Sequence, residues 1–166
     1  MSVDMFLEFD SDAKIVGESI DSDHKSTLQI DGFSFGAEMP ASAESGTGLG
    51  AGKVKFEQFN FKTKSSLASA PAFRDMYSGK HIKKATLYLR KAGGTQEDYM
   101  KFIFKELIIT KYAIDGSGEE PTEDLAFAYT GLYVYYAPQD QKGAIDNGNK
   151  RDAGWDVKAN KEWLGT

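Results

Sequence analysis

The chain has 166 residues, of which 40% are apolar and 13% aromatic, so it is long enough to bury a hydrophobic core. Its formal charge of −5 and its pI near 5.1 argue against nucleic-acid binding, which requires a basic surface. Cysteine is absent, which excludes disulfides and thiolate chemistry.

The N-terminal part of the chain predicts two strands separated by a polar loop. Val3–Phe9 alternates apolar and polar side chains, but Phe6 breaks the pattern, so we expect the second face of this strand to be covered as well. Asp10–Lys25 is polar and predicts a surface loop. The next strand, Thr27–Gly36, changes phase at Gly32, where a β-bulge would re-aim the side chains.

The next segment has the lowest complexity of the chain. Ala37–Gly52 contains mainly small residues and glycine, which bury too little area to offset chain entropy, and it predicts a long flexible loop. Val54–Lys64 predicts a third strand. A short α-helix is predicted at about residues 70–78, with Pro71 in its first turn and Gly79 as its stop. The buried stripe of this helix is expected to be Ala72, Phe73, Met76 and Tyr77.

The centre of the chain predicts two long strands joined by a Gly-Gly turn. Ile82–Lys91 alternates, whereas Tyr99–Tyr112 is almost continuously apolar from Phe102 to Ile109. A run of that kind predicts a strand that is covered on both faces for part of its length.

The C-terminal part predicts an acidic turn-rich loop over Asp115–Asp124, a long strand over Leu125–Ala137 and a closing strand around Trp155. No internal repeat or linker is visible. The aromatic and glycine content, with short periodic runs, favours a mainly β fold with one helix.

The glycine-rich stretch GTGLGAGK at Gly46–Lys53 approaches a nucleotide-binding motif. Thr47 stands where the P-loop pattern needs its first glycine, and Val54 replaces the required Ser or Thr. The looser dinucleotide pattern fits, but a strand instead of a helix is predicted to follow. We therefore interpret the stretch as part of the loop and expect no cofactor.

The polar residues form no recognisable catalytic or metal site. His24 and His81 have no partner at ligand spacing and are interpreted as surface or loop-end residues. Asp115, Ser117 and Glu119 resemble the opening of a calcium loop, but the closing Glu is missing at the required spacing. We therefore expect neither a metal nor an enzymatic activity.

A set of aromatic residues in the C-terminal third is compatible with two interpretations. Aromatic side chains on strands are usually core or oligomer interface, and a sugar-binding groove is the alternative. The set comprises Tyr133, Tyr135, Tyr136, Trp155 and Trp163. A carbohydrate-binding β-sandwich thus stays open as a second class of function.

Short motifs along the chain resemble one known family when they are taken together and in order. They are VDMFLEF near the start, GES at Gly17–Ser19, FSFG at Phe33–Gly36, AGK ending at Lys53, SGKH at Ser78–His81, RKAGG at Arg90–Gly94 followed by EDYMKF, and GWD at Gly154–Asp156. This series resembles the Hcp family, the haemolysin co-regulated proteins that form the inner tube of the bacterial type VI secretion system. The related phage tail-tube proteins are the closest alternative.

The resemblance implies two packed, antiparallel-rich sheets that form a distorted β-barrel with one short helix, like a phage tail tube, as one tube domain over residues 1–166. It implies a homohexameric ring whose subunits pair edge to edge, and rings that stack into a tube. The partners that it implies are a VgrG-like spike protein, the contractile sheath, baseplate proteins and small effectors in the lumen. We expect no nucleic-acid partner.

The same resemblance implies a protein that is cytoplasmic during assembly and is then secreted through the type VI system without a signal peptide. The first ten residues lack the basic and apolar segments of a signal peptide. No apolar run approaches the roughly 18 residues of a membrane span. We therefore expect no membrane insertion.

The family picture also implies two sets of candidate residues. Ala37–Gly52 is expected to be an extended loop that reaches a neighbouring ring or subunit. Ser34, which the alternation turns away from Phe33 and Phe35, is expected on the lumen wall in contact with cargo. The expected contact residues of the loop are Glu38, Met39, Gly46, Gly48, Leu49 and Gly50.

Overall fold

The computed structural model describes residues 2–44, 48–91 and 96–166. Its strands are β1 (Val3–Phe9), β2 (Leu28–Ser34), β3 (Ala37–Glu38), β4 (Ala41–Glu44), β5 (Gly48–Ala51), β6 (Lys55–Phe56), β7 (Phe59–Lys64), β8 (Ile82–Lys91), β9 (Asp98–Asp115), β10 (Thr122–Tyr136), β11 (Arg151–Asp156) and β12 (Lys161–Glu162). Its helical elements are α1 (Ser69–Tyr77) and the short 3₁₀ turns η1 (Ser11–Ala13) and η2 (Asn147–Asn149). The mainly β fold with a short helix is confirmed. The predicted Gly-Gly turn at Gly93 and Gly94 lies outside the described residues.

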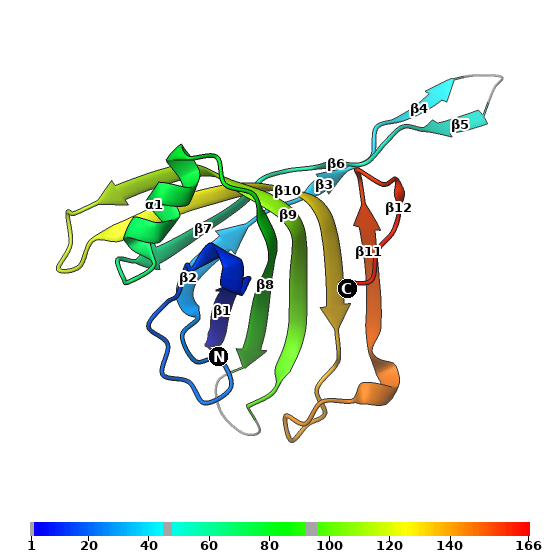
Figure 1. Ribbon diagram of the computed structural model, residues 1–166. Helices are drawn as coiled ribbons and strands as arrows, with labels where there is room; N and C mark the ends of the chain where they lie inside the picture. The colour runs from blue at the N-terminus through cyan, green and yellow to red at the C-terminus, as the bar shows by residue number, and fades with distance from the viewer. Residues whose placement is uncertain (1, 45–47, 92–95) are drawn as a thin grey trace.

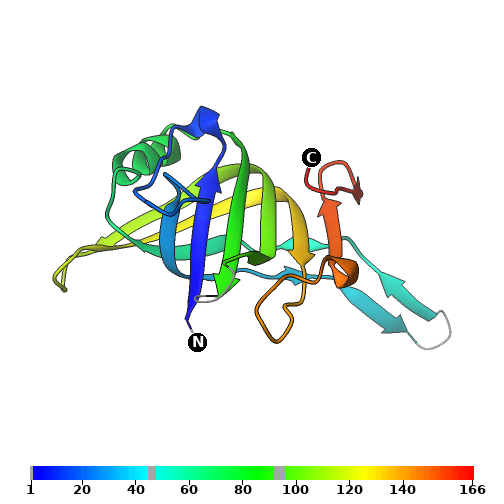
Figure 2. The ribbon, with the colours of Figure 1, turned by 90° about the horizontal axis from the view of Figure 1, so that it is seen from below.

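Six strands close into an antiparallel barrel (Figure 1). Their order is β10–β7–β2–β1–β8–β9, and β9 pairs again with β10 to complete the circle. Figure 2 shows β1, β8, β9 and β10 side by side along one wall. Closure gives each of these strands a partner on both sides over at least part of its length, which removes the exposed edges of an open sheet. The predicted distorted barrel is confirmed.

Three phenylalanines from three strands form the centre of the core. Phe59, Phe104 and Phe127 are each 0% exposed. The ring centroid of Phe59 lies 4.7 Å from that of Phe104 and 4.9 Å from that of Phe127, and those of Phe104 and Phe127 are 5.1 Å apart. Each buried ring contributes roughly 2–3 kcal/mol by removal of apolar area from water. This aromatic centre therefore ties β7, β9 and β10 together.

The long strands β9 and β10 both change phase at the same level. On β9, Phe102 and Phe104 face the core, and so do Leu107 and Ile109, because the inward-outward alternation changes parity at Glu106. Glu106 has a φ of 45°, a left-handed conformation that is unusual for a residue with a side chain. The continuous apolar run thus contains two core-facing stretches, with this kink between them. The side chains that point the other way, such as Ile103, Lys105 and Ile108, are half-buried, which agrees with a strand that is covered on both faces for part of its length.

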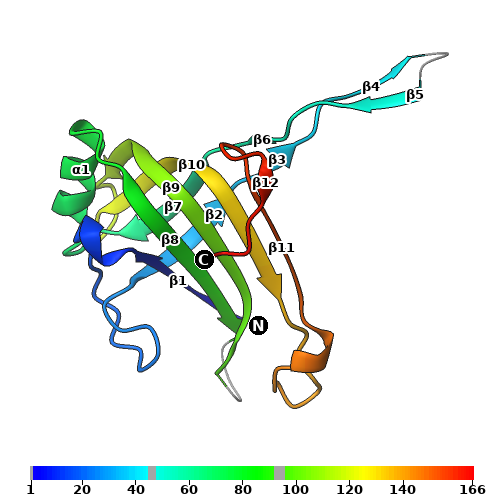
Figure 3. The same ribbon diagram turned by 45° about the vertical axis from the view of Figure 1, so that its right-hand side comes forward.

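The kink lets β10 belong to two different strand pairs on the same side. Residues 122–127 pair with β7 inside the barrel, whereas Gly131–Tyr136 pairs with β11 outside it. The strand β12 continues this extension and pairs with the last two residues of β11 (Figure 3). The predicted closing strand around Trp155 is therefore present, but it lies beside the barrel and does not close it.

The N-terminal elements follow the sequence pattern closely. β1 has the predicted bounds, and Phe6 on its outer face is 3% exposed because the loop between β1 and β2 covers it. The pairing of β2 with β7 shifts between Ile30 and Gly32, which confirms the predicted bulge. The covering loop is only partly a surface loop, since Ile15 and His24 in it are 4% and 5% exposed.

Helix α1 packs on β9 through a narrower face than its sequence pattern predicted. Ala72 is buried and Met76 packs against the core, as expected. Phe73 and Tyr77 are 49% and 63% exposed, so their predicted burial was wrong. The inward position between them belongs to Asp75, which is 1% exposed. The helix ends as predicted, because Gly79 adopts a φ of 65° and donates its N–H to the Met76 carbonyl.

The left-handed residue in β9 yields a test of the kink. The free energy of unfolding of Glu106→Gly should exceed that of Glu106→Ala by about 1 kcal/mol, because glycine adopts a positive φ without steric cost. Lys111, on the same strand, is a matched control at which alanine should be the more stable of the two by roughly 0.5–1 kcal/mol. Urea unfolding of the four variants measures both differences. If the alanine variant were the more stable one at both positions, the left-handed conformation of Glu106 would be refuted.

Candidate assembly surfaces

A two-stranded arm projects from the barrel, and most of its side chains whose burial the structure describes are exposed (Figure 1). β3 pairs with β6 at its root and β4 pairs with β5 beyond it (Figure 1). The prediction of a loop over Ala37–Gly52 was therefore wrong for its described part, in which backbone pairing organises the segment. The sequence could not reveal this, because neither strand has an apolar face that would produce a strand pattern.

The root of the arm is anchored by aromatic packing. The ring of Phe35 lies 5.0 Å from Phe102 and 5.5 Å from Phe104, at the edge of the aromatic centre. The ring of Phe56 stacks on that of Tyr129 at 5.4 Å. The arm therefore leaves the barrel in a direction that two packed rings determine.

Beyond the root of the arm, the residues whose burial the structure describes, 41, 42, 50 and 51, are small and exposed. Ala41 pairs with Ala51 and Ser42 with Gly50, so small residues face one another along the hairpin. Glu38 is exposed at the root, where it pairs with Lys55, and Met39 is 53% exposed. Of the other predicted contact residues, Gly48, Leu49 and Gly50 lie on β5, and Gly46 lies outside the described residues.

Ser34 lies on the outer face of β2, opposite Asn60 of β7. Its side chain is exposed, whereas Phe33 and Phe35 pack against the core, which confirms the predicted alternation. A shallow pocket of about 270 Å³ adjoins it and is also lined by Lys62 and Asp124. This face of the barrel is polar and carries both signs of charge.

The opposite wall has an aromatic outer face. One row of paired residues crosses five strands there, in the order Phe6, Tyr88, Lys101, Tyr135 and Asp152. The Lys101 ammonium lies 5.6 Å from the ring centroid of Tyr88 and 5.5 Å from that of Tyr135, within cation–π range. The two outer faces of the barrel thus differ in chemistry, one polar and one aromatic.

The C-terminal aromatic residues do not gather into one groove. Trp163 is 7% exposed, stacks over Lys105 and donates its indole N–H to the Thr166 carbonyl. Lys105 also donates to the buried carboxylate of Asp156 at 2.7 Å, and this hydrogen bond, with one from the Ala159 N–H, lowers the pKa of Asp156. These contacts hold the β11–β12 extension against the barrel.

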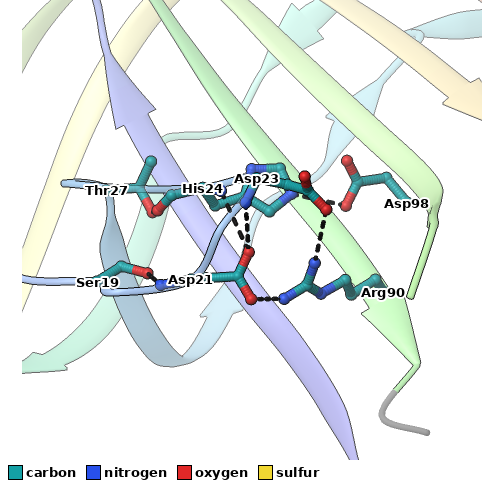
Figure 4. A network of polar contacts seen from close by, with 7 residues as sticks. All are labelled: Ser19, Asp21, Asp23, His24, Thr27, Arg90 and Asp98. Atoms are coloured by element: carbon teal, nitrogen blue, oxygen red, sulfur yellow. Dashed lines mark hydrogen bonds and ion pairs between the residues drawn. The ribbon is translucent and has the colours of Figure 1, made fainter. Parts of the chain in front are cut away.

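A polar network, which we call the clasp, fixes the β1–β2 loop on this wall (Figure 4). The imidazole of His24 lies between the rings of Phe6 and Tyr88, with centroid distances of 4.7 and 4.5 Å, and its Nε2 is 2.9 Å from Asp98. Burial and the carboxylates of Glu8 and Asp98 raise the pKa of Tyr88. His24 lies near the end of its loop, as one of the two predicted placements has it, but it is buried and not on the surface, whereas His81 is exposed.

The second half of the clasp is a buried ion pair. Arg90 is 3% exposed, pairs with Asp21 and lies 3.6 Å from the exposed carboxylate of Asp23. The Arg90 guanidinium also lies 5.0 Å from the ring centroid of Phe6. Sequence patterns missed this site, because Asp21 and Arg90 are 69 positions apart. A polar side chain in a loop gives no signal of such a partner.

Asp21 also shapes the loop that it anchors. Its Oδ1 accepts the backbone N–H groups of Asp23 and His24 at 3.0 and 3.2 Å. Gly17, at the start of the loop, lies so close to β2 that a Cβ there would be 2.2 Å from the Thr27 carbonyl oxygen. The GES motif therefore has a structural reason for its glycine.

Among residues 2–44, 48–91 and 96–166, no group of three or more His, Asp or Glu side chains is placed to hold a metal ion. Within the same residues no helix is long and apolar enough to cross a bilayer. The notable features of the described surface are therefore the arm, the two contrasting outer faces and the clasp.

The clasp predicts unequal effects of two neighbouring aspartates. Asp21→Asn should lower the free energy of unfolding by about 3 kcal/mol, because it leaves the buried Arg90 charge without its main partner. Asp23→Asn, the matched control, should cost less than about 1 kcal/mol, because its carboxylate is exposed. Denaturant unfolding measures both, and small effects of equal size would contradict the buried pair.

Comparison with known proteins identifies the family. Residues 6–136 match the model of the family described as "Type VI secretion system effector, Hcp". The chain is 34% identical over 163 residues to protein hcp1 of Pseudomonas aeruginosa, covering 96% of this chain and 98% of that protein. A structure of a type six secretion system protein superposes with a TM-score of 0.89 at 27% identity, covering 98% of this chain and 100% of that one. Hcp1 from Salmonella typhimurium superposes with a TM-score of 0.78 at 30% identity, with the same coverage. The chain therefore belongs to the Hcp family of type VI secretion system proteins.

Proposed function

We propose that this protein is a non-catalytic tube subunit of the type VI secretion system, in which six copies form a ring and rings stack into the expelled inner tube. Family membership supports self-assembly into rings. The observation that carries the geometry of the proposal is the arm, a two-stranded hairpin whose root packs on the barrel and whose described distal residues are small and exposed. A single two-stranded hairpin is marginal in water, so an arm of this composition gains its stability from a neighbouring copy.

The closed barrel restricts how such a ring can form. Most of the barrel backbone is already paired, so the arm and the β11–β12 extension are the elements outside the barrel that offer backbone edges for pairing. These two elements are different surfaces, so a contact between the root of the arm (β3 and β6) of one copy and another surface of the next is head-to-tail, and the β4–β5 tip is left to contact a neighbouring ring. Head-to-tail contacts generate closed rings when the rotation closes. The proposal thus assigns the contacts between subunits to these two extensions and not to the strands of the closed barrel.

The proposed working cycle follows the family. The chain assembles in the cytoplasm and leaves the cell inside a contracting sheath, without a signal peptide. Its partners are further copies of itself, the sheath, baseplate proteins, a VgrG-like spike protein and small effectors in the lumen. The polar outer face around Ser34 is proposed as part of the lumen wall, because mixed polar side chains suit a water-filled channel. Glu38, Met39, Gly46, Gly48, Leu49 and Gly50 are proposed as arm contacts.

The proposal is tested by the mass and shape of the assembly. The wild type should sediment at about six times the 18.3 kDa chain mass and show rings in negative stain. Replacing residues 42–50 by an Asn-Gly turn keeps the Ala41–Ala51 pair and removes the arm tip. This variant should form rings but shorter stacks in electron micrographs. A stable wild-type monomer would refute the ring, and unchanged stack length would refute the role of the arm tip.

The lumen assignment of Ser34 is tested by adding bulk. Ser34→Trp should leave ring formation unchanged and reduce the amount of small effector proteins that co-purify with the rings, because the indole narrows the channel. Mass spectrometry of the ring fraction measures this amount. Ser2→Trp, a change at another exposed serine, is the control and should have no effect. Equal amounts of co-purified effector in the Ser34→Trp and Ser2→Trp variants would refute the placement of Ser34 on the lumen wall.

A further inference from the structure

We propose that helix α1 and the adjoining end of β9 form a docking surface for a basic, amphipathic segment of another protein. We call this surface the α1 patch and define it by Leu67, Phe73, Tyr77 and Ile114. These side chains are 71%, 49%, 63% and 57% exposed. Large apolar side chains gathered on one surface mark interaction sites in soluble proteins. Phe73 and Tyr77 are also two of the residues that the helical pattern assigned to the core.

The aromatic members of the α1 patch are held in place before any partner arrives. The ring of Phe73 stacks on that of Tyr77 at 5.3 Å with an angle of 11°, and it lies 5.5 Å from the ring of Tyr112. The Tyr112 hydroxyl donates to the buried carboxylate of Glu123 at 2.6 Å, and burial and this hydrogen bond raise the pKa of Tyr112 to about 12. Rings that are ordered in advance lose little conformational freedom on binding.

The charge beside the α1 patch determines the chemistry of the partner. The hairpin that follows β9 carries five carboxylates and no cation between Asp115 and Asp124. Asp124 pairs with Lys111, and Glu123 bonds Tyr112. Asp115, Glu119 and Glu120 are exposed and form no ion pair within the part of the chain that the structure describes. Lys64 lines a pocket together with these three carboxylates, and its ammonium donates a hydrogen bond to the Thr122 hydroxyl.

This arrangement fits a protein segment that presents apolar residues at helical spacing and is flanked by Lys or Arg. The acidic hairpin would repel an anionic membrane or a nucleic acid, both of which recognise basic surfaces. The carboxylates would steer a basic segment toward the α1 patch, and the exposed rings would then provide the contact area.

The α1 patch lies away from the elements proposed to form the ring. In Figure 1 α1 and the β9–β10 hairpin lie on the left, whereas the arm and β11 lie on the right. Figure 3 shows the same separation from another side. A partner can therefore bind here while the arm contacts another copy. This compatibility is the only step that rests on the proposed function.

The experiment uses a fluorescent 18-residue model peptide of Leu and Lys with its leucines on one helical face, and the same peptide with Glu for Lys as control. We expect the Lys peptide to bind the full-length protein, and the Glu peptide to bind at least about tenfold more weakly. The double variant Phe73→Ser/Tyr77→Ser should weaken binding of the Lys peptide by about tenfold or more. Tyr136→Ser, at an aromatic residue that is 45% exposed on another surface, should not.

The charge contribution is tested with Glu119→Gln/Glu120→Gln, which should weaken binding several-fold at low salt and have little effect at high salt. Circular dichroism and sedimentation of each variant monitor the fold and the ring. Equal binding to the wild type and the Phe73/Tyr77 variant, or no preference for Lys over Glu, would overturn the proposal. Loss of the ring in the Phe73/Tyr77 variant would also overturn it, because the α1 patch would then be a contact between copies. A wild type that binds the peptide as a monomer would refute the ring and leave the α1 patch intact.

Discussion

The contact among Phe59, Phe104 and Phe127 is the constraint on which the other features depend. These rings come from β7, β9 and β10, and their mutual packing brings the two ends of the strand order together. The same cluster extends outward to Phe35 and Tyr129, which support the root of the arm. The direction of the arm and the closure of the barrel are therefore consequences of one aromatic core.

The kink at Glu106 lets the barrel carry an extension without opening. β7 begins at Phe59, which lies opposite Phe127, so the edge of β10 beyond this point is free for β11. Because β9 and β10 change phase together, Leu132 and Val134 still pack against the core while Tyr133 and Tyr135 turn outward. Tyr133 then reaches Asp152 of β11. The aromatic outer face and the attachment of the extension thus have a common origin.

Much of the fold followed from the sequence, because alternation is a local signal. It predicted the bounds of β1, the bulge at Gly32 and the stop at Gly79. It was wrong where local pattern and tertiary contact diverge. The arm lacks an apolar face, so its strand pairing produces no pattern in the sequence. Phe73 and Tyr77 have helical spacing, but this spacing does not tell whether another element covers them. The clasp depends on Asp21 and Arg90, which the pairing of β1 with both β2 and β8 brings together. The expected roles of Ser34 and the arm residues stay predictions.

The pairing of β1 with β8 has a consequence for how the chain folds. β2 pairs with only Phe6 and Leu7 of β1, whereas β8 pairs with the whole strand from Val3 to Phe9, so the first strand must wait for nearly ninety residues before its main partner exists. The neighbouring strands β8, β9 and β10 are consecutive and can pair as soon as they are made. Non-local pairing of this kind slows folding and leaves an apolar strand unprotected during translation. The nascent chain is thus vulnerable to aggregation at its first strand, whose Phe6, Leu7 and Phe9 are buried only in the finished barrel.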